Sequence, residues 1–176
     1  ELGSEGYKVW RFNLSKKGID DSVDLQMALR SEDVKGSGKS DESTYKNQKT
    51  NSLEKAFNSE MIGCSFATRE ELSESGIHQS LTEKISWNQN QEAVSILLDG
   101  SHPDNEDLGE VILLVGEGDF DEEGLQNPNN AALVKACAQD IPIRVIRSHG
   151  RYSQMAPSSG FRYDGVYRIT DYYPDQ

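Results

Sequence analysis

Alternating apolar and polar residues predict β-strands near both ends of the chain. The segment "GYKVWRFNL" (residues 6–14) alternates and is rich in aromatic side chains, which is typical of a strand with one buried face. In "YDGVYRIT", the alternation places Tyr163, Gly165, Tyr167 and Ile169 on one face. The segment after it, "DYYPDQ", ends on turn residues and should lead into a further strand. Because a strand without a partner exposes unpaired backbone groups, we expect that strand elsewhere in the chain.

Apolar runs in the middle of the chain predict further strands and short helices. The segments "AVSILL", "EVILLV" and "IPIRVIR" are strand candidates, and the acidic loop "DGSHPDNEDLG" separates the first two. Thr68 and Glu71 have the spacing of a capping box before a short helix. The segment "NNAALVKACAQD" predicts a second helix, with Asn129 or Asn130 as its N-cap. Many strands with few short helices favour a mainly β (α+β) fold, either a β-barrel or a strongly bent sheet with peripheral helices.

Residues 15–59 have a different character. The segment "DSVDLQMALRSED" predicts a short amphipathic helix. The segment that follows, "VKGSGKSDESTYKNQKTNS", is polar, rich in Gly, Ser and Lys, and without periodicity. Such a composition is typical of a flexible linker.

Charged residues are distributed unevenly. The net charge of -12 argues against binding of nucleic acid by overall charge. Residues 99–124 contain ten acidic side chains and no Lys or Arg, whereas residues 141–170 contain five arginines and one acid. Arginines mixed with aromatic and small loop residues are typical of a phosphate-binding surface. A basic surface that only balances the acidic loop is an equal alternative.

Recognisable catalytic and metal-binding motifs are not found in the sequence. The three histidines lack HExxH spacing, the two cysteines lack a CxxC motif, and there is no GxSxG motif. The acidic loop lacks the ligand spacing of a calcium-binding EF-hand. No apolar run approaches the ~20 residues of a membrane span, and no signal peptide is recognised. We therefore expect a non-catalytic module in the cytoplasm or nucleus, with no metal and no cofactor.

A series of motifs resembles the SRA domain, also called the YDG domain, in the order of that family. The motifs are "GIH", "SILLDG", "LVGEG", "NAALVKAC", "IPIRVIRSHG" and "APSSGFRYDGVYRITDYYP", together with the strand "GYKVWRFNL". The most specific is the block "FRYDGVYRITDYYP", which contains Tyr163, Asp164 and Gly165. The resemblance covers about residues 61–176 and is strongest to bacterial versions, which often precede an HNH nuclease.

The resemblance implies a circularly permuted strand order. In the family, the unit after "YDG" runs through a turn into a last strand with an aromatic, Trp-Arg, aromatic centre, and that strand here is "GYKVWRFNL" at the front of the chain. A tandem protein divided within a domain would give the same order. We divide the chain into residues 1–14 as the displaced last strand, residues 15–59 as helix and linker, and residues 60–176 as the SRA-like barrel.

The family fold is a bent barrel related to the PUA fold, and its members flip a modified cytosine out of duplex DNA into a pocket. The resemblance assigns five positions of this chain to the base pocket: His102, Asp104, Asn105, Leu114 and Val115. At two of these positions the family has an aromatic ring and a hydroxyl, which Leu114 and Val115 do not supply. The DNA contacts expected with this pocket are Leu81, Thr82, Lys84, Gly116 and Gly118, and the uneven charge distribution adds Arg144, Arg147 and Arg151. Within "YDG", we expect Asp164 and Gly165 to fix a tight turn.

From this resemblance we expect a DNA-binding reader of 5-methylcytosine or 5-hydroxymethylcytosine that acts by base flipping. It would be the reader part of a modification-dependent restriction system, with a fused or partner nuclease, and it would work in a bacterial cytoplasm, or in the nucleus of a eukaryote. The alternative is an SRA-like protein-interaction or scaffold module that has lost base binding, which the net charge of -12 and the altered pocket favour. A further alternative is that the linker docks a partner.

Overall fold

The computed structural model describes residues 9–16, 61–118 and 127–175. The helix and linker predicted for residues 15–59 lie outside the described residues except for the first two positions, so they stay predictions. The strands are β1 (Val9–Ser15), β2 (Ser65–Phe66), β3 (Ile85–Trp87), β4 (Ala93–Leu98), β5 (Glu106–Asp107), β6 (Val111–Val115), β7 (Ile143–Ser148) and β8 (Phe161–Asp175). The helices are α3 (Arg69–Glu74) and α4 (Pro128–Ala138).

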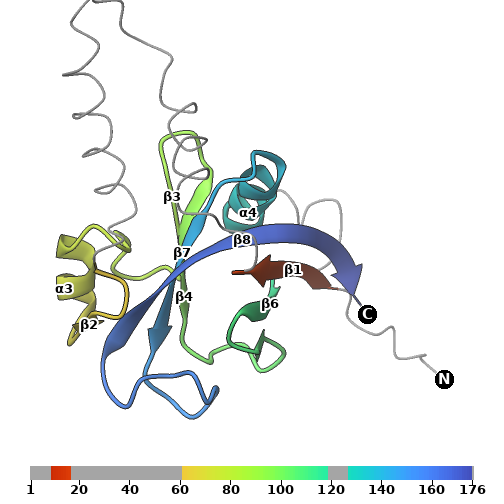
Figure 1. The fold of residues 1–176 in the computed structure, drawn as a ribbon. Coiled ribbons are helices and arrows are strands. Elements are labelled where there is room, and N and C mark those ends of the chain that lie inside the picture. Colours follow the sequence, from red (N-terminus) through yellow and green to blue (C-terminus); the bar gives the residue numbers. More distant parts are fainter. Residues whose placement is uncertain (1–8, 17–60, 119–126, 176) are drawn as a thin grey trace, which may run out of the picture.

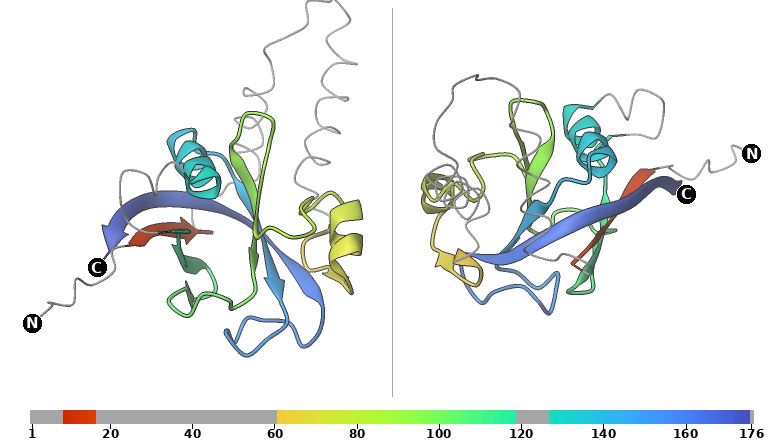
Figure 2. Two further views of the ribbon diagram at one scale, coloured as in Figure 1. Left: turned by 180° about the vertical axis from the view of Figure 1, so that it is seen from behind. Right: turned by 45° about the horizontal axis from the view of Figure 1, so that its top comes forward.

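One bent sheet organises the described part of the chain (Figure 1). Its order is β3-β4-β7-β8-β1-β6-β5, and β2 pairs with β8 beside this path. The neighbours β4 and β7 are parallel, whereas β8 is antiparallel to both β7 and β1. Figure 2 shows how the long strand β8 curves across the whole sheet. The expected mainly β fold with short peripheral helices is confirmed, and among the described residues the sheet path does not close into a barrel.

The predicted pairing of the first strand with the "YDG" strand is confirmed. Leu14 faces Ile169 and Val9 faces Asp175 across an antiparallel ladder, with an irregularity between Asn13 and Leu14. The turn expected at the end of "DYYPDQ" does not include Pro174 or Asp175, because β8 continues to Asp175, and Gln176 lies outside the described residues. Pairing with β1 satisfies the backbone groups of this segment, and that gain outweighs its local turn preference. The origin of the strand order by circular permutation stays a prediction.

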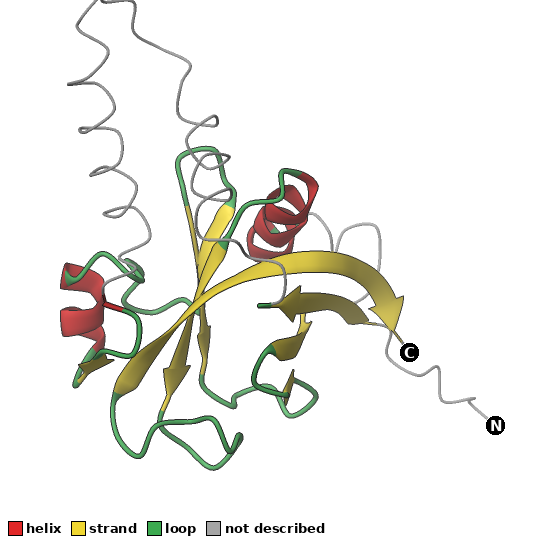
Figure 3. Ribbon diagram, viewed as in Figure 1, coloured by secondary structure: helices red, strands yellow, loops and turns green. Residues whose placement is uncertain are grey.

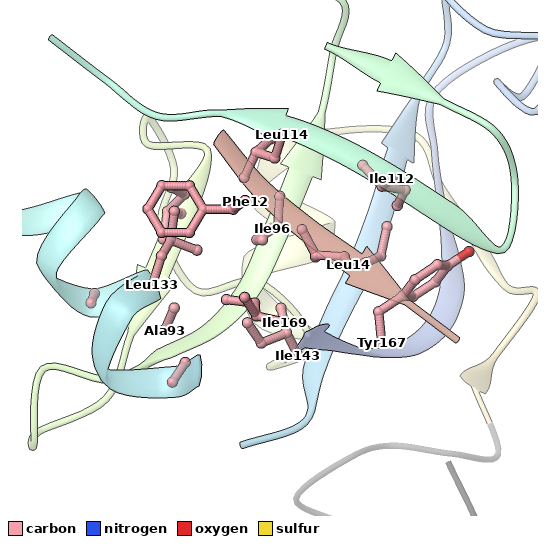
Figure 4. Packing of buried hydrophobic residues seen from close by; sticks show 14 of the residues in the cluster. Phe12, Leu14, Ala93, Ile96, Ile112, Leu114, Leu133, Ile143, Tyr167 and Ile169 are labelled. Atoms are coloured by element: carbon pink, nitrogen blue, oxygen red, sulfur yellow. The ribbon is translucent and has the colours of Figure 1, made fainter. Parts of the chain in front are cut away.

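Strand β1 is an interior strand, with β8 on one side and β6 on the other. Its alternation places Phe12 and Leu14 in the larger core cluster, at 0% and 1% exposure. Figure 4 shows these two side chains between residues from β4, β6, β7, β8 and α4. A smaller cluster forms beside α3 and contains Leu72, Ile77 and Tyr163. Figure 3 shows the two helices well apart, so each covers a different part of the sheet.

The two described helices begin as their capping residues require. Thr68 is the N-cap of α3 and accepts from the backbone N–H of Glu71, as the capping box predicts, but the carboxylate of Glu71 accepts from the N–H of Ala67 and not from that of Thr68. The N-cap of α4 is Asn127, not Asn129 or Asn130 as predicted, and Pro128 occupies the first helical position. Buried Asn130 instead bonds through its side chain to both backbone groups of Glu117. The helix is thereby attached to the segment that follows β6.

Candidate nucleic-acid interface

The loop between β4 and β5 carries three of the residues that the resemblance assigns to a base pocket. Asn105 is half-buried, and its Oδ1 atom accepts a hydrogen bond of 2.7 Å from the backbone N–H of Val115. Only the amide oxygen can accept, so this bond sets the orientation of the amide and leaves Nδ2 as the donor side. The structure therefore brings Asn105 to the end of β6.

His102 lies in the same loop and is also half-buried. Its Nδ1 atom accepts from the backbone N–H of Asp104 at 3.3 Å, and its carbonyl oxygen accepts from the N–H of Asn105 at 3.3 Å. A neutral imidazole that accepts at Nδ1 carries its proton on Nε2. Asp104 is exposed, and its carbonyl oxygen accepts from Arg11 of β1 at 3.1 Å. His102 and Asn105 thus retain N–H donors, whereas Asp104 supplies carboxylate acceptors.

Two other predicted pocket positions lie in the interior. Leu114 and Val115 are each 6% exposed, and Leu114 belongs to the larger core cluster. Val115 also contributes its backbone N–H, which donates to Asn105 and orients its amide. A role of these two side chains against a base stays a prediction.

The two glycines after β6 differ in their surroundings. Gly116 is buried and donates its N–H to the carbonyl of Trp10 at 2.7 Å, and a Cβ at this position would lie 2.8 Å from Oδ1 of Asn130. Glycine at this position thus allows close packing, and its predicted DNA contact stays a prediction. Gly118 is exposed with a φ of +74°, a conformation that favours glycine.

The loop between α3 and β3 is held by buried polar groups. His78 is fully buried, with Nδ1 at 2.7 Å from Oγ of Ser95 and Nε2 at 2.8 Å from the carbonyl oxygen of Glu83. Burial lowers the pKa of His78 to about 4, so the ring is neutral at pH 7. Arg69 of α3 donates to the carbonyls of Ser80 and Glu83 at 2.7 and 2.9 Å. The sequence motif "GIH" contains His78, but nothing in it indicated this anchoring role.

This anchored loop exposes the residues predicted to probe DNA. Leu81 is 52% exposed, and Thr82 is exposed beside it. Lys84 follows at the end of the loop, hydrogen-bonds to Ser101 and lies 3.7 Å from the carboxylate of Asp99. Lys84 thus connects the loop between α3 and β3 to the loop that bears His102 and Asn105. The structure brings the two predicted groups of residues together at one end of the sheet.

The prediction that Arg144 and Arg147 meet phosphates is wrong. Both lie on β7, an interior strand, and are 9% and 2% exposed. Arg144 donates from Nε to the carbonyl of Ile77 at 2.7 Å. Arg147 binds Asp107 through Nε and Nη2, both at 2.7 Å, and Asp164 through Nη1 at 2.9 Å. These arginines organise the interior instead of the surface.

The buried ion pairs explain the "YDG" motif. We predicted that Asp164 fixes a turn, but it lies within β8 and binds both Arg147 and Arg162. Gly165 has a φ of +107° where the ladder with β7 is irregular. Burial by itself would raise the pKa of Asp107, but hydrogen bonds from Arg147 and Ser153 lower the pKa by more than burial raises it. The net pKa of Asp107 therefore lies below the usual range. Sequence reasoning counted Asp107 only as part of an acidic loop.

Of the five arginines in residues 141–170, Arg151 is exposed and the other four are buried or partly buried. Arg162 and Arg168 are partly buried and pair with Asp164 and Asp140. Within the described ranges, no group of three His, Cys, Asp or Glu could hold a metal ion. In those same ranges, no helix combines the length and apolar character that crossing a membrane requires.

Comparison with known proteins places these features in one family. The SAD/SRA domain description matches residues 55–176. A UHRF1-like protein of Cryptococcus neoformans is 35% identical over 126 residues, covering 61% of this chain and 37% of that protein. The E3 ubiquitin-protein ligase ORTHRUS-LIKE 1 of Arabidopsis thaliana is 37% identical over 114 residues, covering 62% of this chain and 24% of that protein. The chain thus spans well under half of these relatives.

Solved structures show the same similarity in three dimensions. A modification-dependent TagI restriction endonuclease superposes with a TM-score of 0.56 at 35% identity, covering 62% of this chain and 41% of that one. The SUVH5 SRA domain in complex with hemi-methylated CG DNA superposes with a TM-score of 0.51 at 26% identity, covering 64% of this chain and 74% of that one. The same domain bound to fully hydroxymethylated CG DNA superposes with a TM-score of 0.51 at 26% identity, covering 64% of this chain and 76% of that one.

Proposed function

The chain belongs to the SAD/SRA domain family, and on this premise we propose that it is a reader module that binds duplex DNA containing a modified cytosine. The observation that carries the proposal is the similarity to SRA domains solved with methylated and hydroxymethylated DNA. Similarity to a modification-dependent restriction endonuclease supports a role beside a nuclease, either fused or separate. Such a reader would act in a bacterial cytoplasm, or in a nucleus if the chain is eukaryotic.

The proposed mechanism is base flipping. Extrusion of a base costs a few kcal/mol, and contacts in a pocket together with a side chain that fills the vacated space must offset this cost. The anchored Leu81 provides an exposed apolar side chain, and Lys84 connects its loop to the loop of His102 and Asn105. The donors of His102 and Asn105 suit the O2 and N3 acceptors of cytosine, and the carboxylate of Asp104 suits its amino group.

Pocket variants and phosphate variants are expected to behave differently. His102→Ala or Asn105→Ala should reduce the preference for modified over plain DNA by about 1–3 kcal/mol. Arg151→Ala should weaken binding of all duplexes alike and reduce the slope of log K against log salt by about 1. Fluorescence anisotropy with duplexes of one sequence, carrying plain, methylated or hydroxymethylated cytosine, measures both effects.

The matched control for Arg151 is Lys135→Ala, which removes an exposed cation on α4 that contacts Gln91. This variant should bind every duplex as the wild type does. Equal wild-type affinity for plain and modified duplexes would contradict the reader function. Absence of any binding at low salt would favour the protein-interaction module, which the net charge and the internal pairing of most arginines support.

Leu81→Ala is expected to weaken binding of a modified duplex about tenfold, because partial burial of a leucine supplies roughly 1–2 kcal/mol. The loss should shrink when the target base is mismatched, since a mismatched base costs less to extrude. Fluorescence of 2-aminopurine next to the target base would follow the extrusion itself. The control is Ile62→Ala, at an apolar residue that is 45% exposed and is not assigned to the interface. Equal losses for paired and mismatched targets would argue against a role of Leu81 in flipping.

A further inference from the structure

Two loops that lie far apart in the sequence are joined by side chains at the candidate interface. One is the pocket loop, residues 99–109, which runs from β4 through β5, and the other is the arginine loop, residues 149–160, between β7 and β8. Ser153 of the arginine loop donates its hydroxyl to Oδ2 of Asp107 at 2.6 Å. Tyr152 lies against Gly100, where an added Cβ would come within 2.5 Å of the Cβ of Tyr152.

The carboxylate that receives the Ser153 bond is itself fixed. Arg147 holds both oxygens of Asp107 at 2.7 Å. Asp107 Oδ1 also accepts from the N–H of Gly109 at 3.1 Å, and the carbonyl of Gly109 accepts from Tyr167 at 2.6 Å. The pocket loop is therefore bonded to β7 and β8 at its C-terminal end. Because Asp107 cannot shift without breaking these bonds, Ser153 is attached to a rigid point two residues from Asn105.

Tyr152 holds the other end of the pocket loop. Its hydroxyl lies 2.9 Å from the carbonyl oxygen of Leu98 and 2.7 Å from that of Ser148, and it can donate to either. Burial raises the pKa of Tyr152 above its usual range, so the hydroxyl remains a donor at neutral pH. The ring packs on Gly100, whose φ of +74° favours glycine. Tyr152 and Ser153 thus contact the pocket loop on both sides of His102 and Asn105.

We propose that Ser153 and Tyr152 are positioning residues that couple the arginine loop to the base pocket. The proposal rests on the reader function argued above. Arg151, the exposed arginine expected to meet phosphate, directly precedes both residues. A phosphate contact by Arg151 and a base contact by Asn105 are then made by parts of one hydrogen-bonded unit. Neither Ser153 nor Tyr152 needs to touch DNA for this coupling.

The first test uses the free protein. Ser153→Ala should speed amide hydrogen exchange at Asn105 and Gly109, whose N–H groups are bonded within the pocket loop. Exchange in β7 and the urea midpoint should remain close to wild type, because Arg147 still pairs with Asp107. Ser153→Thr keeps the hydroxyl and should restore slow exchange. The matched control is Ser158→Ala, at an exposed serine of the same loop. Unchanged exchange in Ser153→Ala would overturn the proposal.

The second test measures base preference. Ser153→Ala and Tyr152→Phe should each lower the preference for modified over plain duplex roughly fivefold, while the salt slope stays that of the wild type. If Ser153 acts through Asn105, adding Ser153→Ala to Asn105→Ala should lower the preference no further. Full additivity, or an unchanged preference in Ser153→Ala, would overturn the coupling to base reading. A wild type without any preference would contradict the reader function, while the exchange test would still decide whether Ser153 holds the loop.

Discussion

A chain that lacks residues 1–14 is expected not to fold cooperatively. Strand β1 lies between β8 and β6, so its removal leaves each of these two strands with one unpaired edge in the middle of the sheet. It also removes Phe12 and Leu14, which are 0% and 1% exposed in the larger core cluster. Burial of two such side chains contributes about 1.5–3 kcal/mol each, a large part of the 5–15 kcal/mol that stabilises an ordinary domain.

Phe12→Ala tests the contribution of β1 to the core with a single substitution instead of a deletion. Loss of the ring should lower the free energy of unfolding by about 3–5 kcal/mol, since it leaves a cavity beside Tyr172 and Gly116. Urea denaturation followed by circular dichroism measures this change. Trp87→Ala is the control, because Trp87 is 44% exposed on β3 at one end of the sheet path, and it should cost clearly less. A soluble deletion variant with a sharp melting transition would show that β1 is not required by the fold.

Arg147→Ala is expected to destabilise the protein by about 3–5 kcal/mol, because it leaves buried carboxylates without their cation. The side chains of Arg147 and Asp107 are 3% and 6% exposed, and that of Asp164 is 13% exposed. Arg147→Lys should also be destabilising, because an ammonium cannot reproduce the two parallel bonds of the guanidinium to Asp107. Arg151→Ala, at an exposed position, should stay within about 0.5 kcal/mol of wild type in urea denaturation.

The effect of Arg147→Ala should depend on pH in a defined direction. In the wild type, the pKa of Asp107 lies below its ordinary value of 3.8, so its contribution is present above that value and is lost as pH falls through the folded-state pKa. In the variant, a buried carboxylate without a cation has a raised pKa, and its protonation relieves the penalty. The difference in unfolding free energy should therefore be largest near neutral pH and should narrow towards pH ~3.5. A difference that is constant with pH would contradict this account of the ion pair.

The sequence by itself determined the main strands, one helix cap and the family. Alternation in "GYKVWRFNL" and "YDGVYRIT" identified β1 and β8, and the resemblance to the SRA domain implied that they pair, as the antiparallel ladder shows. The capping box at Thr68 is a local interaction between residues three apart, so sequence spacing was enough to find it. The same reasoning missed Asn127 as the cap of α4, because three asparagines lie close together and their spacing alone does not distinguish them.

Only the tertiary structure decided what the charged residues do. Sequence reasoning grouped Arg144, Arg147 and Arg151 as one basic surface, but β7 is an interior strand and buries the first two. One partner of Arg147 is Asp107, 40 residues away, and no local pattern connects them. An arginine is therefore a surface cation or a buried cross-link depending on which carboxylate the fold brings to it. The strand pattern is a local property of the chain, whereas a charge gains its role from distant contacts, and for this reason only Arg151 of these three kept its predicted place.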